Sequence, residues 1–452
     1  MLDRDRSSLT APFILGIIVT AAAGIFLFVV RWRYTIFRDD VDLGIFSQVI
    51  GSIGHGFSTT AEGGSSHLLV HWSPIIVVAW PMLRIFGPIG LQYTQALLIA
   101  STLIPIYALA RALTGNRRAI VLTAVAALYP TLWGNAVGDF HEMAFVPVLS
   151  ATFVYALDRR KWILCGVAVL ALLCTKEDQF VILAWNGLTI AVTNASNRVL
   201  RNVGLLVALA AIITAVLYFG VVRPHVGPGI PYLTTRFYDW DATRAAIATP
   251  ASTFLSLRLY YVAIALAPLL FLPCISRYGL FLIPGIVEIT ASHMPVTLMP
   301  GAHYSALLTG YALAAFVDGF SRLRTWNVPA SAIALGLAAA VSISIEIFAS
   351  PMEYWYYLYR APNAHDALLE RTVRSLPRDG NIGAEDEIFA HLGPDPNASV
   401  GFHDQQWFVY DDTHFSTQWR DVDRPLVRKA VADGAYRTVS SSDGIVVLHK
   451  SH

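Results

Sequence analysis

Charged residues are scarce in this chain. Asp, Glu, Lys and Arg make up 14% of its 452 residues, whereas an ordinary soluble protein has roughly 25%. The three cysteines, Cys165, Cys174 and Cys274, lie singly in apolar runs, so their spacing predicts neither a disulfide framework nor a cysteine metal site. No patch of Lys and Arg is large enough to indicate nucleic-acid binding, and we expect no nucleic-acid partner. The first apolar run lacks a small-residue cleavage site, so we expect it to be retained as a span.

Hydrophobic residues are abundant instead. They make up 55% of the chain, and the mean hydropathy is +0.53, which predicts an all-α polytopic membrane protein. Apolar windows predict about eleven transmembrane helices. These lie near residues 11–30, 89–110, 119–137, 143–157, 162–176, 179–193, 203–222, 258–275, 278–291, 303–320 and 329–349.

The loops between the predicted spans alternate in charge. Basic residues gather in every second loop, which the positive-inside bias places in the cytoplasm. The opposite loops hold the acidic and histidine clusters, and Arg31, Arg33 and Arg38 are exceptions to the bias on that side. An odd number of spans then places the C-terminal region outside as well. The basic residues are Arg111, Arg117, Arg118, Arg159, Arg160, Lys161, Arg198, Arg201, Arg277, Arg322 and Arg324.

Two regions differ in character. Residues 1–350 form the predicted transmembrane domain, whose first outer loop, 31–88, contains an interfacial or re-entrant helix over 72–86 that does not cross the membrane. Residues 351–452 alternate amphipathic stretches with short β-like runs, and Ser442-Asp443-Gly444 is typical of a hairpin turn. We therefore expect a small extracytoplasmic α/β domain in residues 351–452, which we call the tail.

Three carboxylates follow the first span directly, in Arg38-Asp39-Asp40-Val41-Asp42. Acidic residues at a membrane boundary are costly to desolvate and usually have a function there. A carboxylate at this place would suit a base that takes the proton of an acceptor hydroxyl, or a ligand for a divalent cation. A solvated acidic loop has the same composition, so the residues alone leave both interpretations open.

Histidines lie on the same predicted side. His67 and His71 are four residues apart, and their spacing leaves three roles open: metal ligation, hydrogen bonding to a substrate, or a plain place at the interface. His303 and Tyr304 enter the tenth predicted span from this side. The loop 223–257 mixes aromatic and charged residues, as sugar-handling loops and aromatic belts both do.

Two charged motifs interrupt the later apolar runs. Asp139-Phe140-His141-Glu142 lies at a junction between spans, where Asp139 would cap the next helix if it had no functional role. Lys176-Glu177-Asp178 predicts a tight outer turn or groups that face a polar cavity. Because ionisable groups at membrane depth are tolerated chiefly where they pair or share a cavity, we expect both motifs to join Asp40 and His71 in one outward-open cavity.

Taken in order, these motifs resemble those of the GT-C superfamily of lipid-phosphate-sugar-dependent glycosyltransferases, such as the protein O-mannosyltransferases, the aminoarabinose transferases and the oligosaccharyltransferase catalytic subunits. Asp39-Asp40 and Asp42 match its acidic motif after the first span. His71-Trp72-Ser73-Pro74 looks like a variant of its His-Pro-Pro segment, with Trp-Ser in place of the first Pro. More closely, residues 35–350 resemble a prokaryotic family of predicted membrane proteins of unknown function.

The resemblance implies an inverting glycosyltransferase in a prokaryotic cytoplasmic (inner) membrane. Such an enzyme would move a sugar from a polyprenyl-phosphate donor, within the lipid bilayer, to an extracytoplasmic glycan, lipid or protein. Asp39 or Asp40 would be the catalytic base. Arg38, His71, His141, Lys176 and His303 would bind substrate or phosphate, and Asp42, Asp139, Glu142 and Glu177 would ligate a metal or orient other groups.

The only cofactor we expect is a divalent cation, Mg²⁺ or Mn²⁺. Two other functions remain open: a membrane carrier or flippase for a lipid-linked substrate, and a scaffold that presents the tail to a partner. A carrier is typically built from paired halves with interrupted helices, and the sequence has no such internal symmetry.

Overall fold

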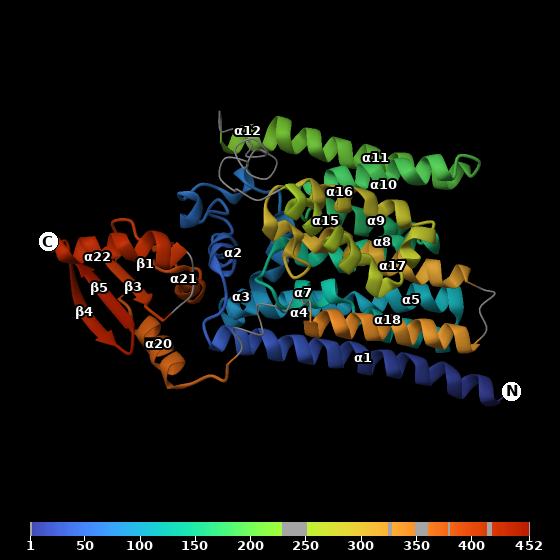
Figure 1. Ribbon diagram of the computed structural model, residues 1–452. Helices are drawn as coiled ribbons and strands as arrows, with labels where there is room; N and C mark the ends of the chain where they lie inside the picture. The colour runs from blue at the N-terminus through green and yellow to red at the C-terminus, as the bar shows by residue number, and fades with distance from the viewer. Residues whose placement is uncertain are drawn as a thin grey trace.

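The computed structural model describes residues 2–227, 251–323, 328–348, 360–377, 380–413 and 418–451. Figure 1 shows a bundle of helices with a small sheet domain at one end, and the N-terminus lies at the opposite end of the bundle. Residues 228–250 of the aromatic and charged loop, and residues 349–359 at the start of the tail, lie outside the described part.

Long apolar runs form helices here because a backbone in lipid must satisfy its hydrogen bonds within its own segment. The bundle and its outer loop contain α1 (Leu2–Thr35), α2 (Val41–Gly51), α3 (Trp80–Phe86), α4 (Ile89–Ser101), α5 (Leu103–Thr114), α6 (Asn116–Ala126), α7 (Pro130–Val137), α8 (Val146–Asp158), α9 (Trp162–Leu173), α10 (Asp178–Thr193), α11 (Arg198–Leu217), α12 (Arg223–Val226), α15 (Ala251–Leu266), α16 (Ile283–Ala291), α17 (Ala306–Arg322) and α18 (Val328–Phe348).

Four segments of the described chain are helices long and apolar enough to cross a membrane. A fifth is made by α6 and α7 if their 57° bend lies within one broken span, and Pro130 explains that break because proline cannot donate a helical hydrogen bond. The predicted count of about eleven is not confirmed: α8, α9 and α10 have 13, 12 and 16 residues, and a bilayer core needs about 20. The four are Thr10–Thr35, Ile89–Thr114, Arg198–Val226 and Pro329–Phe348.

The segment predicted as an interfacial helix is short. It consists of a six-residue 3₁₀ helix, η3 (Pro74–Ala79), followed by the seven residues of α3, which together cannot span a bilayer. The backbone N–H of Ile75 donates to the carbonyl of Cys174 at 3.0 Å. The segment therefore lies against the turn that carries Lys176.

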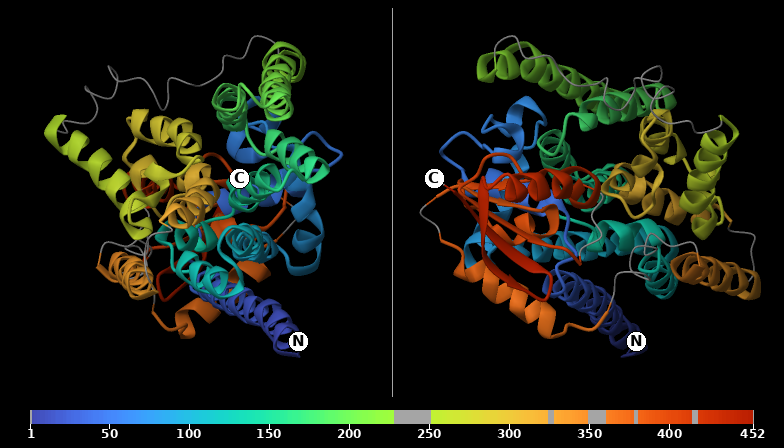
Figure 2. Two further views of the ribbon diagram at one scale, coloured as in Figure 1. Left: turned by 90° about the vertical axis from the view of Figure 1, so that its right-hand side faces the viewer. Right: turned by 60° about the vertical axis from the view of Figure 1, so that its left-hand side comes forward.

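The centre of the bundle is α17, in which every residue from Ala306 to Phe320 is buried. It packs on α8. Gly310 of α17 lies so close to Pro147 and Ser150 of α8 that a side chain at position 310 would not fit. Figure 2 shows α1 and the α10–α11 pair on the outside of the bundle. Their exposed apolar side chains, such as Phe28 of α1 and Val181 of α10, are those expected to face lipid.

The tail is a mixed sheet flanked by α20 (Ala364–Ser375), α21 (Asp386–Leu392) and α22 (Arg424–Ala432). The strand order is β2-β1-β3-β5-β4, with β1 parallel to both neighbours and β5 antiparallel to both of its own. The predicted hairpin turn is confirmed, since Asp443 and Gly444 have φ values of 52° and 85°, as a type I′ turn requires. The strands are β1 (Ile382–Ala384), β2 (Ala398–Val400), β3 (Trp407–Asp411), β4 (Tyr436–Ser442) and β5 (Ile445–Lys450).

Candidate functional site

The predicted site residues lie at the end of the bundle that carries the tail (Figure 1). They come from five places along the sequence: the start of α2, the stretch before η3 that carries His71, the junction between α7 and the 3₁₀ helix η4 (Glu142–Phe145), the turn between α9 and α10, and the 3₁₀ helix η10 (His303–Ser305).

The acidic segment is tied to the junction after α7. Arg33 forms an ion pair with Asp139 and donates to the carbonyl of Val137 at 2.9 Å. The Asp139 carboxylate also accepts the backbone N–H of Asp40 at 2.6 Å. The cap of η4 is His141 instead, so Asp139 connects two segments rather than capping the next helix.

The three aspartates of the acidic segment have different surroundings. Asp39 is buried; its carboxylate accepts Nε2 of Gln92 at 3.0 Å and lies 3.7 Å from Arg33. Asp40 reaches the surface and caps α2 by accepting the N–H of its neighbour at 2.7 Å. Burial, followed by repulsion from Asp40 and Asp139, raises the pKa of Asp42 to about 8. Although Asp40 is exposed, desolvation by the protein around its carboxylate and the Asp139 charge raise its pKa to about 6.

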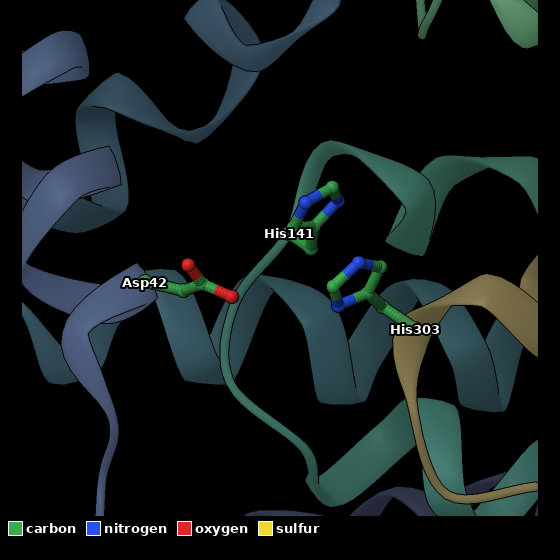
Figure 3. Close-up of side chains that lie close together, drawn as sticks. All are labelled: Asp42, His141 and His303. Carbon is green, nitrogen blue, oxygen red and sulfur yellow. The ribbon is translucent and has the colours of Figure 1, made fainter. Parts of the chain in front are cut away.

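Asp42 faces two histidines (Figure 3). Asp42, His141 and His303 each offer a ligand atom, and these atoms lie within 4.8 Å of one another. The two imidazole rings are stacked, with centroids 3.7 Å apart and planes 8° from parallel. Burial lowers the pKa of His141 to about 4 and also lowers that of His303. Neutral imidazole is the form that binds a metal ion.

A glutamate supports His141. Oε2 of Glu142 lies 2.9 Å from Nδ1 of His141, and the Glu142 side chain is fully buried. A carboxylate on one ring nitrogen fixes the orientation of the imidazole and leaves the other nitrogen for a ligand. Burial alone would raise the pKa of Glu142, but His141 and Lys176 lower it well below its usual value.

Lys176 lies between two carboxylates. Its ammonium is 3.6 Å from Oε1 of Glu142 and 3.5 Å from Oδ2 of Asp178, and it lies over the ring of Tyr304 at 5.8 Å from the centroid. Burial would lower the pKa of Lys176, but Asp178 and Glu142 raise it well above its usual value. The ammonium therefore stays charged in a buried position, as ion pairing requires.

His71 contacts the same turn through Glu177. Its Nδ1 is 2.7 Å from Oε1 of Glu177, whose other oxygen accepts the N–H of Trp72 at 2.9 Å. The ring centroid of His71 is 6.5 Å from that of His141 and 5.6 Å from that of His67. The imidazoles thus form a row that ends at His303.

The predicted residues are therefore brought into one connected cluster, with one exception. Arg38 points to the tail, where its guanidinium lies 3.0 Å from Oε1 of Glu387. The outward-open cavity that we expected around the cluster stays a prediction.

Sequence reasoning missed three side chains that hold the cluster together. Besides Arg33, they are Gln92 and Gln95 on α4; Gln95 donates to the carbonyls of Gly138 and Asp139 at 2.8 and 3.1 Å. Its own oxygen accepts the N–H of His141 at 3.1 Å. The sequence did contain a signal for the two glutamines. They lie three residues apart in a mostly apolar helix, and polar side chains in a span usually have a partner.

Comparisons with known proteins show the family and the fold of this chain. The family described as Predicted membrane protein (DUF2079) matches residues 33–447. No curated protein sequence matches the chain. The crystal structure of ArnT from Cupriavidus metallidurans bound to undecaprenyl phosphate is similar, with a TM-score of 0.54, 14% identity, and coverage of 96% of this chain and 97% of that chain. The apo form of the same protein gives 0.53 at 14% identity, with the same coverage.

The archaeal oligosaccharyltransferase AglB from Archaeoglobus fulgidus, in complex with an inhibitory peptide and a dolichol-phosphate, gives a TM-score of 0.46 at 12% identity, covering 96% of this chain and 74% of that chain. At these low identities the ArnT match shows the fold alone. It shows that this chain shares the fold of ArnT.

Proposed function

The chain belongs to the DUF2079 family of predicted membrane proteins, and we propose that it is a glycosyltransferase that takes a sugar from a polyprenyl-phosphate donor. The acceptor would be an extracytoplasmic glycan, lipid or protein. One observation carries this proposal: carboxylates, imidazoles and a buried ammonium meet in one cluster, on a fold shared with ArnT bound to undecaprenyl phosphate.

Asp40 is the carboxylate best suited to be the base. Asp39 is occupied by Gln92 and Arg33, whereas Asp40 reaches the surface. The base takes the proton of the acceptor hydroxyl while the hydroxyl oxygen forms the new bond to the anomeric carbon of the sugar. The bond from that carbon to the phosphate oxygen breaks at the same time, and the polyprenyl phosphate leaves with both electrons.

The donor phosphate would lie near Lys176. The ammonium is the cation at the centre of the cluster, and its two carboxylate partners hold it at 3.5 and 3.6 Å, longer than a tight ion pair. A phosphate can therefore gain a charge-assisted contact there. His71 and His303 flank the same place. We assign Arg38 to the contact with the tail rather than to the phosphate, because Glu387 already neutralises it.

We also propose a divalent cation held by Asp42, His141 and His303, with Asp139, Glu142 and Glu177 as orienting groups. Three ligand atoms lie within 4.8 Å of one another and Glu142 orients one imidazole, so the residues fit such an ion once the two stacked rings turn to aim their nitrogens at it. Two imidazoles suit Mn²⁺ better than Mg²⁺, which prefers oxygen ligands. When bound, the ion would supply positive charge to the departing phosphate.

The expected membrane arrangement belongs to the same proposal. The cluster and the tail would face outward from a prokaryotic inner membrane. The short helices α8, α9 and α10 would count among about eleven membrane-crossing segments, and the bilayer would be locally thinner around them.

The experiment is donor cleavage by the purified full-length protein in lipid nanodiscs, supplied with a panel of undecaprenyl-phosphate-linked sugars and their cell-envelope acceptors. Release of undecaprenyl phosphate is measured. Asp40→Asn should lower its rate by at least about 100-fold, since an amide cannot take the proton. The control is Asp404→Asn, an exposed tail residue paired only with Lys450 among its described contacts. Wild-type release from Asp40→Asn would overturn the assignment, and transbilayer movement without cleavage would favour a carrier.

A further inference from the structure

The tail packs directly on the acidic segment. Helix α21 of the tail lies against α2 (Figure 1). A Cβ added to Gly44 of α2 would lie 2.5 Å from Cε1 of Phe389 in α21, so only glycine permits this approach. On the same interface, the side chain of Gln48 donates to the carbonyls of Asp395 and Ala398, each at 2.8 Å. The tail is thus fitted to the helix that Asp40 caps.

One tail side chain reaches further, into the connection between α1 and α2. The imidazole of His391 is stacked on Phe37, with centroids 3.7 Å apart and planes at 14°. Its other face is stacked on Tyr34 at 4.0 Å and 27°. The His391 side chain is only 2% exposed, and its Nδ1 lies 3.7 Å from Oε2 of Glu370 in α20. His391 is therefore held by the tail and enclosed by the connection.

The backbone at this place needs support. Phe37 has a φ of 53°, a left-handed conformation that a bulky residue adopts only where its surroundings enforce it. The N–H of Arg38 closes the turn made by this conformation by donating to the carbonyl of Arg33 at 3.2 Å. Two residues further on, the N–H of Asp40 donates to Asp139 at 2.6 Å.

We propose that His391 is a positioning residue: by filling the space between Tyr34 and Phe37 it holds the left-handed turn and, through it, the Asp40–Asp139 contact. The tail would then complete the site without touching the substrate. The consequence for catalysis rests on the proposed function, in which Asp40 is the base; the consequence for the geometry does not.

The test is hydrogen–deuterium exchange on the full-length protein, in peptides covering residues 36–43. His391→Ala should speed exchange of the Arg38 and Asp40 amides by at least about tenfold, because their hydrogen bonds open when the turn relaxes. His391→Phe should stay near wild type, since it keeps the two stacked faces. Unchanged exchange in His391→Ala, or equal exchange in both variants, would overturn the proposal.

A second variant guards against simple unfolding of the tail, which would appear as faster exchange in β3 and β5. Gly44→Ala pushes α21 away through Phe389 and should also speed exchange of the Asp40 amide. Gly24→Ala is the matched control, because a Cβ there meets nothing within 4 Å. If His391→Ala unfolds the tail, the Gly44→Ala variant provides the test. Exchange of the Asp40 amide at the wild-type rate in Gly44→Ala would then contradict the proposal.

Catalysis gives an independent readout in the donor-cleavage assay. His391→Ala should lower kcat with little change in KM, and His391→Phe should restore it. If the wild-type protein itself releases no lipid phosphate, the proposed function fails, while the exchange data still judge the positioning role. If the wild type is active and His391→Ala keeps its full kcat, the positioning role is wrong.

Discussion

The Asp139 carboxylate accepts the backbone N–H of Asp40 at 2.6 Å, although 99 positions separate the two residues. The same carboxylate pairs with Arg33, at the end of α1. One side chain therefore joins the first span, the acidic segment and the junction after α7.

Asp139→Ala should lower the free energy of unfolding by about 1.5–3 kcal/mol, because it removes the nearer of the two carboxylates beside Arg33 and the acceptor of the Asp40 N–H. Unfolding of the purified protein by a graded detergent titration measures it. Arg420→Ala is the control: its pair with Asp421 is exposed on both sides and should contribute nothing measurable. Equal stability of the two variants would show that the contacts of Asp139 do not stabilise the fold.

Mn²⁺ binding should depend on His303. Removing one of the three proposed ligands in His303→Ala should weaken the affinity at least about tenfold. His365→Ala, which changes a tail histidine outside the cluster, should leave it unchanged. Calorimetric titration of Mn²⁺ into the apo protein tests this, and equal affinities would show that the ion is held elsewhere.

The tail should lie outside the cell. In a cysteine-free background, a cysteine at residue 397 should react with a membrane-impermeant maleimide on intact cells, and one at residue 118 should react only after lysis. Both Arg118 and Asn397 are exposed, so access is not limited by folding. The asymmetry of the loop charges predicts this result; the reverse labelling pattern would invert the topology.

The tail should be more stable in mild acid. His365 lies 2.5 Å from Asp411 and 2.9 Å from Asp443; burial opposes its charge, but these carboxylates raise its pKa above the usual value. A raised folded-state pKa gives stability that is present below about 6.5 and is lost as pH rises through the folded value. The melting temperature should therefore fall as the pH rises above about 6.5, and His365→Gln should reduce that fall.

Sequence patterns located the acidic segment, the Asp139 motif and the Lys176 turn because charged groups are conspicuous in apolar runs. The pairing of Lys176 with a carboxylate followed from the cost of burying an unpaired ammonium. Local patterns could not reveal that Arg33 would reach Asp139, since an arginine at the end of a span usually anchors at the interface.

The span count and the tail contact were beyond local patterns for another reason. An apolar window does not reveal where a helix breaks, as it does at Pro130. Nor does anything in the sequence near His391 indicate a place between Tyr34 and Phe37, because that contact forms only when residues some 350 positions apart pack together.

The close fit of Gly44 to Phe389 also constrains how members of this family can diverge. A larger residue at position 44 has to be matched by a smaller one at 389, and a charge change at Arg38 has to be matched at Glu387. The two pairs should covary among relatives. A tail transplanted from a distant relative should fail to dock unless α2 is transplanted with it.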